Sequence, residues 1–123
     1  MKNRIVILTF LFAGFILLSG CGNSELKKDT RGLSDAMCRI IDVMNKLKAV
    51  NPADSEQVTL LQMQAKNLQI EMTILNKEFQ EKYKNKLSDE KFKKDYSKYF
   101  REAMLTCPHL SKEDRERFQK EVE

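Results

Sequence analysis

The chain has 123 residues, which is enough for one small folded domain and too few for two. Charged residues make up 33% of it, and 22 Lys and Arg against 18 Asp and Glu give a formal net charge of +4 at pH 7. Lys2 and Arg4 supply two of these positive charges, and the remaining excess is too small to indicate a nucleic-acid-binding protein.

The first 20 residues have the pattern of an export signal. Lys2 and Arg4 precede an uncharged, mostly apolar segment from Ile5 to Leu18. This segment is shorter than the roughly 20 residues that a membrane-spanning helix needs. A basic start, a short apolar segment and small residues before a cleavage point are typical of a secretory signal peptide. Two other interpretations of residues 1–21 are an ordinary signal peptide that happens to be followed by Cys21, and a helix that is buried in the protein core.

Residues 18–21, Leu-Ser-Gly-Cys, resemble the lipobox of bacterial lipoproteins, in which a leucine and two small residues precede a cysteine. The resemblance covers residues 1–21 only. It implies cleavage just before Cys21, a diacylglycerol on the Cys21 thiol and often an acyl chain on the new amino group. Stable membrane anchoring requires two or more acyl chains.

The residue after this cysteine is Gly22, not the aspartate that typically retains lipoproteins at the inner membrane. In a host with two membranes the resemblance therefore implies the outer membrane, facing the periplasm. In a host with one membrane it implies the outer face of the cytoplasmic membrane.

The predicted mature chain begins with a flexible tether and continues into a helix. Residues 22–30 show no hydrophobic periodicity. From Leu33 onward, apolar residues recur every three or four positions, which predicts an amphipathic helix from about 31 to 49. Asn51-Pro52 ends this helix, because a residue before proline is disfavoured in the helical conformation.

A longer second helix is predicted from about 55 to 86, with Asp54 or Ser55 as its N-cap. Its main apolar line has heptad-like spacing of four and three residues and comprises Leu61, Ala65, Leu68, Met72, Leu75 and Phe79.

Two further helices follow. Ser88 and the acidic residues after it predict the start of a third helix, from about 88 to 106, which Pro108 ends. Ser111 opens a short terminal helix, from about 112 to 122, with few apolar residues.

The predicted fold is therefore all-α: a small bundle of three main helices and a short C-terminal one, in which the long helix of residues 55–86 is central. Residues 1–20 form the lipoprotein signal peptide. Residues 21–30 form the lipidated cysteine and flexible tether, and residues 31–123 form the helical domain.

Cys38 and Cys107 are the two cysteines left once Cys21 carries lipid. At a rise of about 1.5 Å per residue, the unequal lengths of the predicted helices bring these two cysteines to the same height in the bundle. An oxidising compartment outside the cytoplasm favours a bond between them, so we predict a disulfide. Two free thiols in a host without an oxidising system are the other possibility.

The second helix carries apolar residues on the face opposite its main line. Relative to Leu61, the side chains of Met63, Ile70 and Ile74 point at about 180–220° around the helix axis. Either the terminal helix or another part of the bundle covers these residues, or they form a surface for a partner protein or for a second copy of the chain.

Residues 81–101 interleave lysines with aromatic residues. Such a pattern can bind nucleic acid. Here the aromatic residues share one helical stripe, which favours a core role and no nucleic-acid partner. The lysines could also face anionic lipid headgroups or a wall polymer.

No pattern of catalytic or metal-ligating residues is present in the sequence. The single histidine, His109, follows Pro108 in a predicted loop, so no Ser-His-Asp set is indicated. A zinc site needs at least three protein ligands. We therefore expect no enzyme activity, no metal and no cofactor apart from the lipid on Cys21.

The sequence favours an exported, lipid-anchored interaction or scaffold module, which holds or blocks another envelope protein or forms a homodimer. The alternative is a carrier for an apolar ligand such as a lipid. In that case the ligand would enter a core rich in methionine and aromatic residues, namely Met37, Met44, Met72, Phe79 and Phe100.

Overall fold

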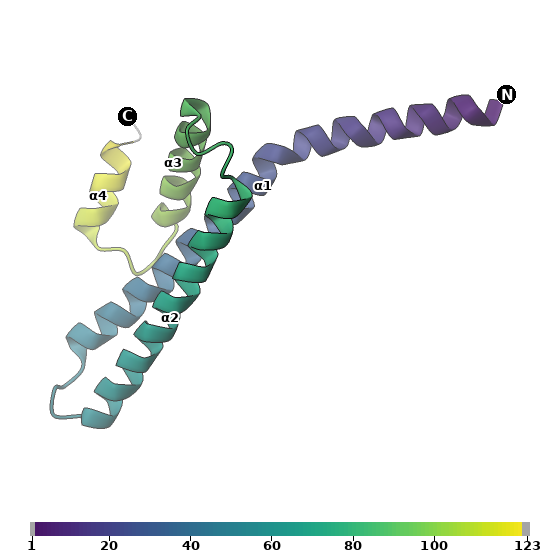
Figure 1. The fold of residues 1–123 in the computed structure, drawn as a ribbon. Coiled ribbons are helices and arrows are strands. Elements are labelled where there is room, and N and C mark those ends of the chain that lie inside the picture. Colours follow the sequence, from purple (N-terminus) through teal and green to yellow (C-terminus); the bar gives the residue numbers. More distant parts are fainter. Residues whose placement is uncertain (1, 122–123) are drawn as a thin grey trace.

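The structure, a computed structural model, describes the backbone of residues 2–121 and the side chains of residues 24–121. It contains helices α1 (Lys2–Ala49), α2 (Ser55–Lys82), α3 (Glu90–Leu105) and α4 (Lys112–Lys120), and no strand in the described backbone (Figure 1). The predicted all-α bundle of three main helices and a short fourth is confirmed. The proposed cleavage and lipidation sites lie outside the residues whose side chains are described.

Each of the last three helices begins at a side chain that accepts a backbone hydrogen bond. The Asp54 carboxylate accepts from the Gln57 N–H at 3.1 Å, and the Ser111 hydroxyl accepts from the Asp114 N–H at 3.1 Å. The cap of α3 is Asp89 instead of the predicted Ser88, because the Asp89 carboxylate accepts from the Lys91 N–H. These bonds satisfy N–H groups that have no partner in the first turn of a helix.

α2 ends at Lys82, four residues before its predicted end. The Tyr83 N–H still bonds to the Phe79 carbonyl, but the Lys86 N–H bonds to the Tyr83 carbonyl, only three residues back. This tighter winding ends the α-helix and begins the turn that leads into α3.

The expectation of a flexible tether is wrong for residues 24–30, which belong to α1 and to the core. Leu26 is 4% exposed and Thr30 is fully buried. The Thr30 hydroxyl donates to the Leu26 carbonyl at 2.7 Å, so its burial leaves no unpaired polar group. Leu26, Thr30 and Leu33 are four and three residues apart and therefore share one face of α1.

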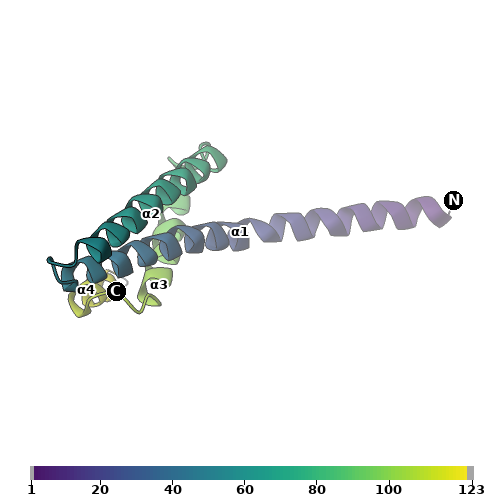
Figure 2. The same cartoon turned by 90° about the horizontal axis from the view of Figure 1, so that it is seen from below.

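The central helix is α1, and the prediction that the helix of residues 55–86 is central is wrong. The backbone of α1 lies against both α2 and α3, while the backbone of α4 lies against α3. Figures 1 and 2 show α4 beside α3, on the other side of α1 from α2. The helical segment 24–30 adds to these contacts, because Leu26 packs in the cluster that also contains Phe79 of α2 and Phe92 of α3.

The core consists of three clusters along the bundle. At the end next to the α2–α3 turn, all three main helices meet at Leu26, Leu33, Phe79, Tyr83 and Phe92. At the opposite end, α1 and α2 meet at Val43, Leu61 and Ala65. A third cluster, Met104, Cys107 and Leu110, joins α3 and the following loop to α1, and Phe118 of α4 packs against it.

Candidate interaction surface

Four apolar side chains on the outer face of α2 are exposed in the single chain. They are Leu60, Met63, Ile70 and Ile74, with relative exposures of 49%, 58%, 51% and 53%, and we call them the outer line of α2. The side chains that face α1 lie on the opposite side of the helix, and among them Leu61, Ala65 and Phe79 are buried.

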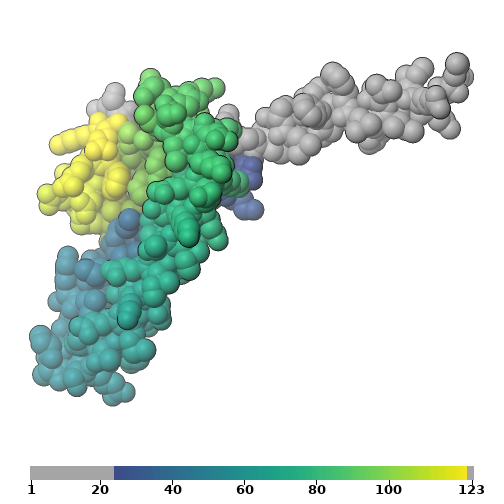
Figure 3. Space-filling view, viewed as in Figure 1, coloured from purple at the N-terminus to yellow at the C-terminus, as the bar shows by residue number. Residues whose placement is uncertain are grey.

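No other helix of the described chain covers the outer line. α4 packs on α3 through the cluster around Cys107, away from α2. In Figure 3 the surface of α2 crosses the front of the molecule from end to end. Of the two possibilities left open by the sequence, the structure shows the outer line uncovered in one copy of the chain.

Met63, Ile70 and Ile74 were identified from the sequence, whereas Leu60 was missed. It lies three residues before Met63, so helical spacing alone places it near the same line. Leu60 lies next to Leu61, where the main apolar line begins, and a pair of adjacent apolar residues does not by itself show which one faces inward.

The predicted Cys38–Cys107 disulfide is present, with Cα atoms 5.7 Å apart. Cys107 is buried in the third cluster, where Met37, Ile41 and Phe100 surround the bond. α4 is held close to the disulfide, because the guanidinium of its residue Arg115 donates hydrogen bonds to the carbonyls of Leu105 and Cys107.

An ionic cluster joins residues 25–29 of α1 to the end of α2. Lys82 Nζ lies 2.7 Å from an Asp29 carboxylate oxygen and 2.6 Å from one of Glu25. The Tyr83 hydroxyl also donates to Asp29, at 2.7 Å. Burial raises the pKa of Asp29, but the hydrogen bonds from Lys82 and Tyr83 outweigh it and hold that pKa below its usual value. Burial, followed by the hydrogen bond to Asp29, raises the pKa of the Tyr83 phenol.

We expect Asp29 to contribute to acid unfolding. A carboxyl with a lowered pKa in the folded state adds stability above its unfolded pKa of about 3.9, and this stability is lost as the pH falls through the folded value. Asp29→Asn should therefore be less stable than the unmodified chain at pH 6, and the difference should shrink towards pH 2. Thermal unfolding across this range measures it. The exposed Asp35→Asn serves as the control, and a difference for Asp29→Asn that does not change with pH would contradict the expectation.

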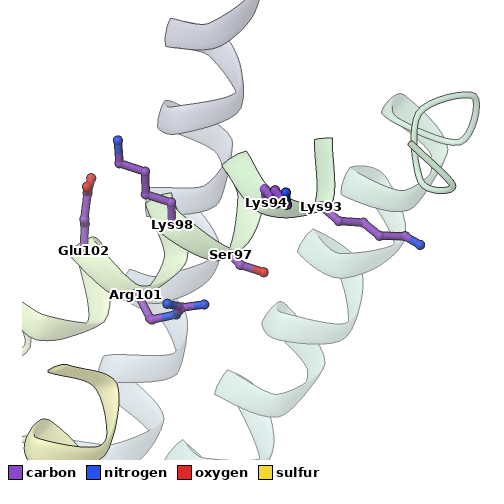
Figure 4. Close-up of a pocket in the computed structure, with 6 residues that line it drawn as sticks. All are labelled: Lys93, Lys94, Ser97, Lys98, Arg101 and Glu102. Atoms are coloured by element: carbon purple, nitrogen blue, oxygen red, sulfur yellow. The ribbon is translucent and has the colours of Figure 1, made fainter. Parts of the chain in front are cut away.

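The surface of residues 24–121 has hollows along α3, between α1 and α3, and between α1 and α2, and at least two lysines line each of these three. One, of about 470 Å³, lies along α3 and is lined by Lys93, Lys94, Ser97, Lys98, Arg101 and Glu102 (Figure 4). In Figure 4 the Lys93 and Lys98 side chains point away from each other. They do not converge on one point, as the ligands of a specific anion site would.

A second hollow, of about 430 Å³, lies between α1 and α3. It is lined by Ser24, Lys27, Lys28, Arg31, Tyr99, Glu102, Ala103 and Thr106. Three of these residues, Lys27, Lys28 and Arg31, are basic.

His109 lies in the loop after α3, where its Nδ1 is 3.5 Å from an Asp42 carboxylate oxygen. Within residues 24–121, no group of three or more His, Cys, Asp or Glu side chains is placed to hold a metal ion. The same part of the chain contains no helix that is both long and apolar enough to cross a membrane.

Comparison with known proteins identifies no relative: no protein-family model, curated protein or solved structure matches the chain.

Proposed function

We propose that this protein is an exported, lipid-anchored, non-catalytic module that binds a protein partner at the cell envelope, either another envelope protein or a second copy of the chain. The observation that carries the proposal is the outer line of α2, where four apolar side chains on one face of the helix are exposed. Apolar side chains gathered on one surface mark interaction sites, because their burial by a partner removes apolar area from water.

Two features support a location outside the cytoplasm. The first is the export signal with its lipobox-like end at Cys21. The second is the Cys38–Cys107 disulfide, which is independent of the signal and is a bond that persists in oxidising compartments.

The charge distribution supports a membrane-facing end. Cys21 precedes Ser24 by three residues, so a lipid on it would attach to the end of the bundle that also holds the α2–α3 turn. Exposed lysines at this end, namely Lys27, Lys28, Lys82, Lys84, Lys86 and Lys91, outnumber the exposed acidic residues there, namely Glu25, Glu81, Asp89 and Glu90. Near an anionic membrane surface each such charge contributes about 1 kcal/mol of attraction.

The carrier alternative finds no specific support. The residues expected to open for an apolar ligand do not line one cavity: Met72 and Phe79 belong to the cluster near the α2–α3 turn, whereas Met37 and Phe100 belong to the one around Cys107. Met44 is exposed, at 43%. A carrier pocket for an apolar ligand would be concave and largely apolar.

The proposal is tested in intact bacteria that express the full-length chain with a photoreactive residue in place of Ile70, and the same residue in place of Gln69 as the matched control. We expect light to produce one discrete crosslinked product with the probe at position 70 and much less with the probe at position 69. Mass spectrometry then identifies the captured protein. In parallel, labelled palmitate should be incorporated into the chain, and Cys21→Ala should abolish this labelling.

Each half of the experiment can fail separately. If palmitate labelling is absent or persists in Cys21→Ala, the lipid anchor at Cys21 is wrong. If the probe at position 70 gives no product beyond that of position 69, the outer line is not a binding surface.

A further inference from the structure

The outer line of α2 contains a regular heptad pattern when Asn67 is included. The positions Leu60, Met63, Asn67, Ile70 and Ile74 follow one another at intervals of three, four, three and four residues. Alternating intervals of three and four are the a and d positions of a coiled coil, with Leu60, Asn67 and Ile74 at a and Met63 and Ile70 at d. The pattern is separate from the inner line, which packs on α1.

This spacing indicates which kind of surface fits the outer line. A line of a and d residues presents knobs that fit between four side chains of another helix with the same spacing. The described chain offers no second helix for this role, since α1 contacts the opposite face of α2 and α4 lies across α1 from it (Figure 2). A second copy of α2 supplies the same spacing.

Asn67 at an a position indicates a coiled coil of two helices that are in register. It is exposed in the single chain. A polar residue at one a position weakens a coiled coil but fixes its register and its number of strands, because each asparagine side chain pairs with its counterpart on the other helix. In an in-register pair the two Asn67 side chains meet each other.

The flanking charges favour parallel helices. In a parallel pair each g residue faces the e residue five positions later on the other copy, which sets Lys66 against Glu71 of the second copy. In an antiparallel pair e residues face e residues and g residues face g residues, so Lys66 does not meet Glu71 of the second copy and this attraction is lost. Glu71 already pairs with Arg39 of its own chain at 2.5 Å, and both side chains remain about half exposed.

From these observations we infer that two copies of this chain associate through the outer lines of α2 as a parallel, in-register coiled coil. This inference rests on the proposed function, in which the outer line is a binding surface, and names the partner as a second copy. Parallel pairing places the Ser24 ends of both copies on the same side, as two lipid anchors in one membrane require.

The pairing segment from Leu60 to Ile74 spans about 21 Å, only two heptads, so its affinity in dilute solution is low. Anchoring both copies in one membrane raises their effective concentration and favours the pair without any added contact. The inference is therefore tested with the full-length chain in membranes.

Single cysteine substitutions test the register. Ile70→Cys and Ile74→Cys place thiols that meet their counterparts in a parallel pair, whereas Gln69→Cys and Asn76→Cys, at c positions, point away. After mild oxidation of membranes, non-reducing gels should show covalent dimers of the first two variants at least about tenfold more abundant than of the last two, because a disulfide needs Cα atoms within about 7 Å. The unsubstituted chain shows the background from Cys38 and Cys107.

Three outcomes overturn the inference. The first is equal crosslinking at positions 69 and 70. The second is crosslinking of co-expressed Met63→Cys with Ile74→Cys that exceeds self-crosslinking of Ile74→Cys, which identifies an antiparallel pair. The third is capture of a different protein by the photoreactive residue at position 70 without dimers of Ile70→Cys, and in that case the proposed function stands while the second copy is excluded.

A disruptive variant checks that the dimer depends on the outer line. Ile70→Asp, combined with Ile74→Cys, buries a carboxylate in each copy of the pair and should reduce dimer formation at least about tenfold, while Gln69→Asp with Ile74→Cys should leave it unchanged. The inner line of α2 is intact in both variants, so equal helix content by circular dichroism shows that folding is preserved. Undiminished crosslinking in the Ile70→Asp variant would contradict the inference.

Discussion

Loss of the Cys38–Cys107 disulfide is expected to lower the midpoint of thermal unfolding by about 15 °C. The bond joins residues 69 positions apart. Closing a loop of this length restricts the unfolded chain and stabilises the fold by about 4 kcal/mol on the chain-entropy estimate. In a domain of roughly 100 residues each kcal/mol changes the midpoint by several degrees.

The measurement compares the chain from Ser24 onward, which contains all three core clusters, with its Cys38→Ala, Cys107→Ala double variant. Because Cys107 is buried, a reducing agent reaches the bond mainly when the structure opens, and the double variant avoids this difficulty. A strong reductant should bring the unmodified chain to the midpoint of the variant and should not affect the variant. A change of less than about 3 °C would mean that the core alone holds α3 to α1.

Phe79→Ala is expected to reduce the free energy of unfolding by about 3–5 kcal/mol. Phe79 is 8% exposed, and its ring lies 4.7 Å from Tyr83, 5.2 Å from Tyr96 and 6.3 Å from Phe92 between ring centroids. Side chains of α2 and α3 meet here, and removal of the ring leaves a cavity among three aromatic neighbours. In a domain whose total stability is about 5–15 kcal/mol, this change would leave a substantial fraction unfolded.

Urea denaturation of both forms measures the effect, with Gln80→Ala as the control. Gln80 is the next residue of α2 and is exposed, so its replacement should change the free energy of unfolding by less than about 0.5 kcal/mol. Equal effects of the two substitutions would show that the aromatic cluster does not hold α2 and α3 together.

Helical periodicity sufficed to predict the helices, because each main helix has an apolar line at intervals of three and four residues. It also predicted the disulfide, since the height of Cys38 and Cys107 in the bundle depends mainly on helix lengths. The predicted tether is wrong because residues 22–30 are mostly polar and were judged by composition. The spacing of Leu26, Thr30 and Leu33 continues the apolar line of α1 backwards, and a threonine whose hydroxyl bonds to its own helix can occupy a buried position.

The choice of central helix was not predictable from periodicity, because the longest apolar line does not show which helix has neighbours on two sides. Met44 illustrates the same limit: the sequence predicts it to be a core residue, yet it is exposed and its neighbour Val43 is buried. The exposure of Ile70 depends likewise on where α4 packs. In α4 only Phe118 is a large apolar residue, and it packs at the disulfide instead of on α2.

The disulfide divides the chain into a covalent ring and two ends. The ring runs from Cys38 through α2 and α3 to Cys107, so the whole of α2 lies inside it. The covalent path between the two ends of the chain therefore runs from α1 across the sulfur atoms into the segment after Cys107, and it bypasses α2. Tension between the N-terminal and C-terminal ends of the protein therefore reaches the helix with the outer line only through noncovalent contacts.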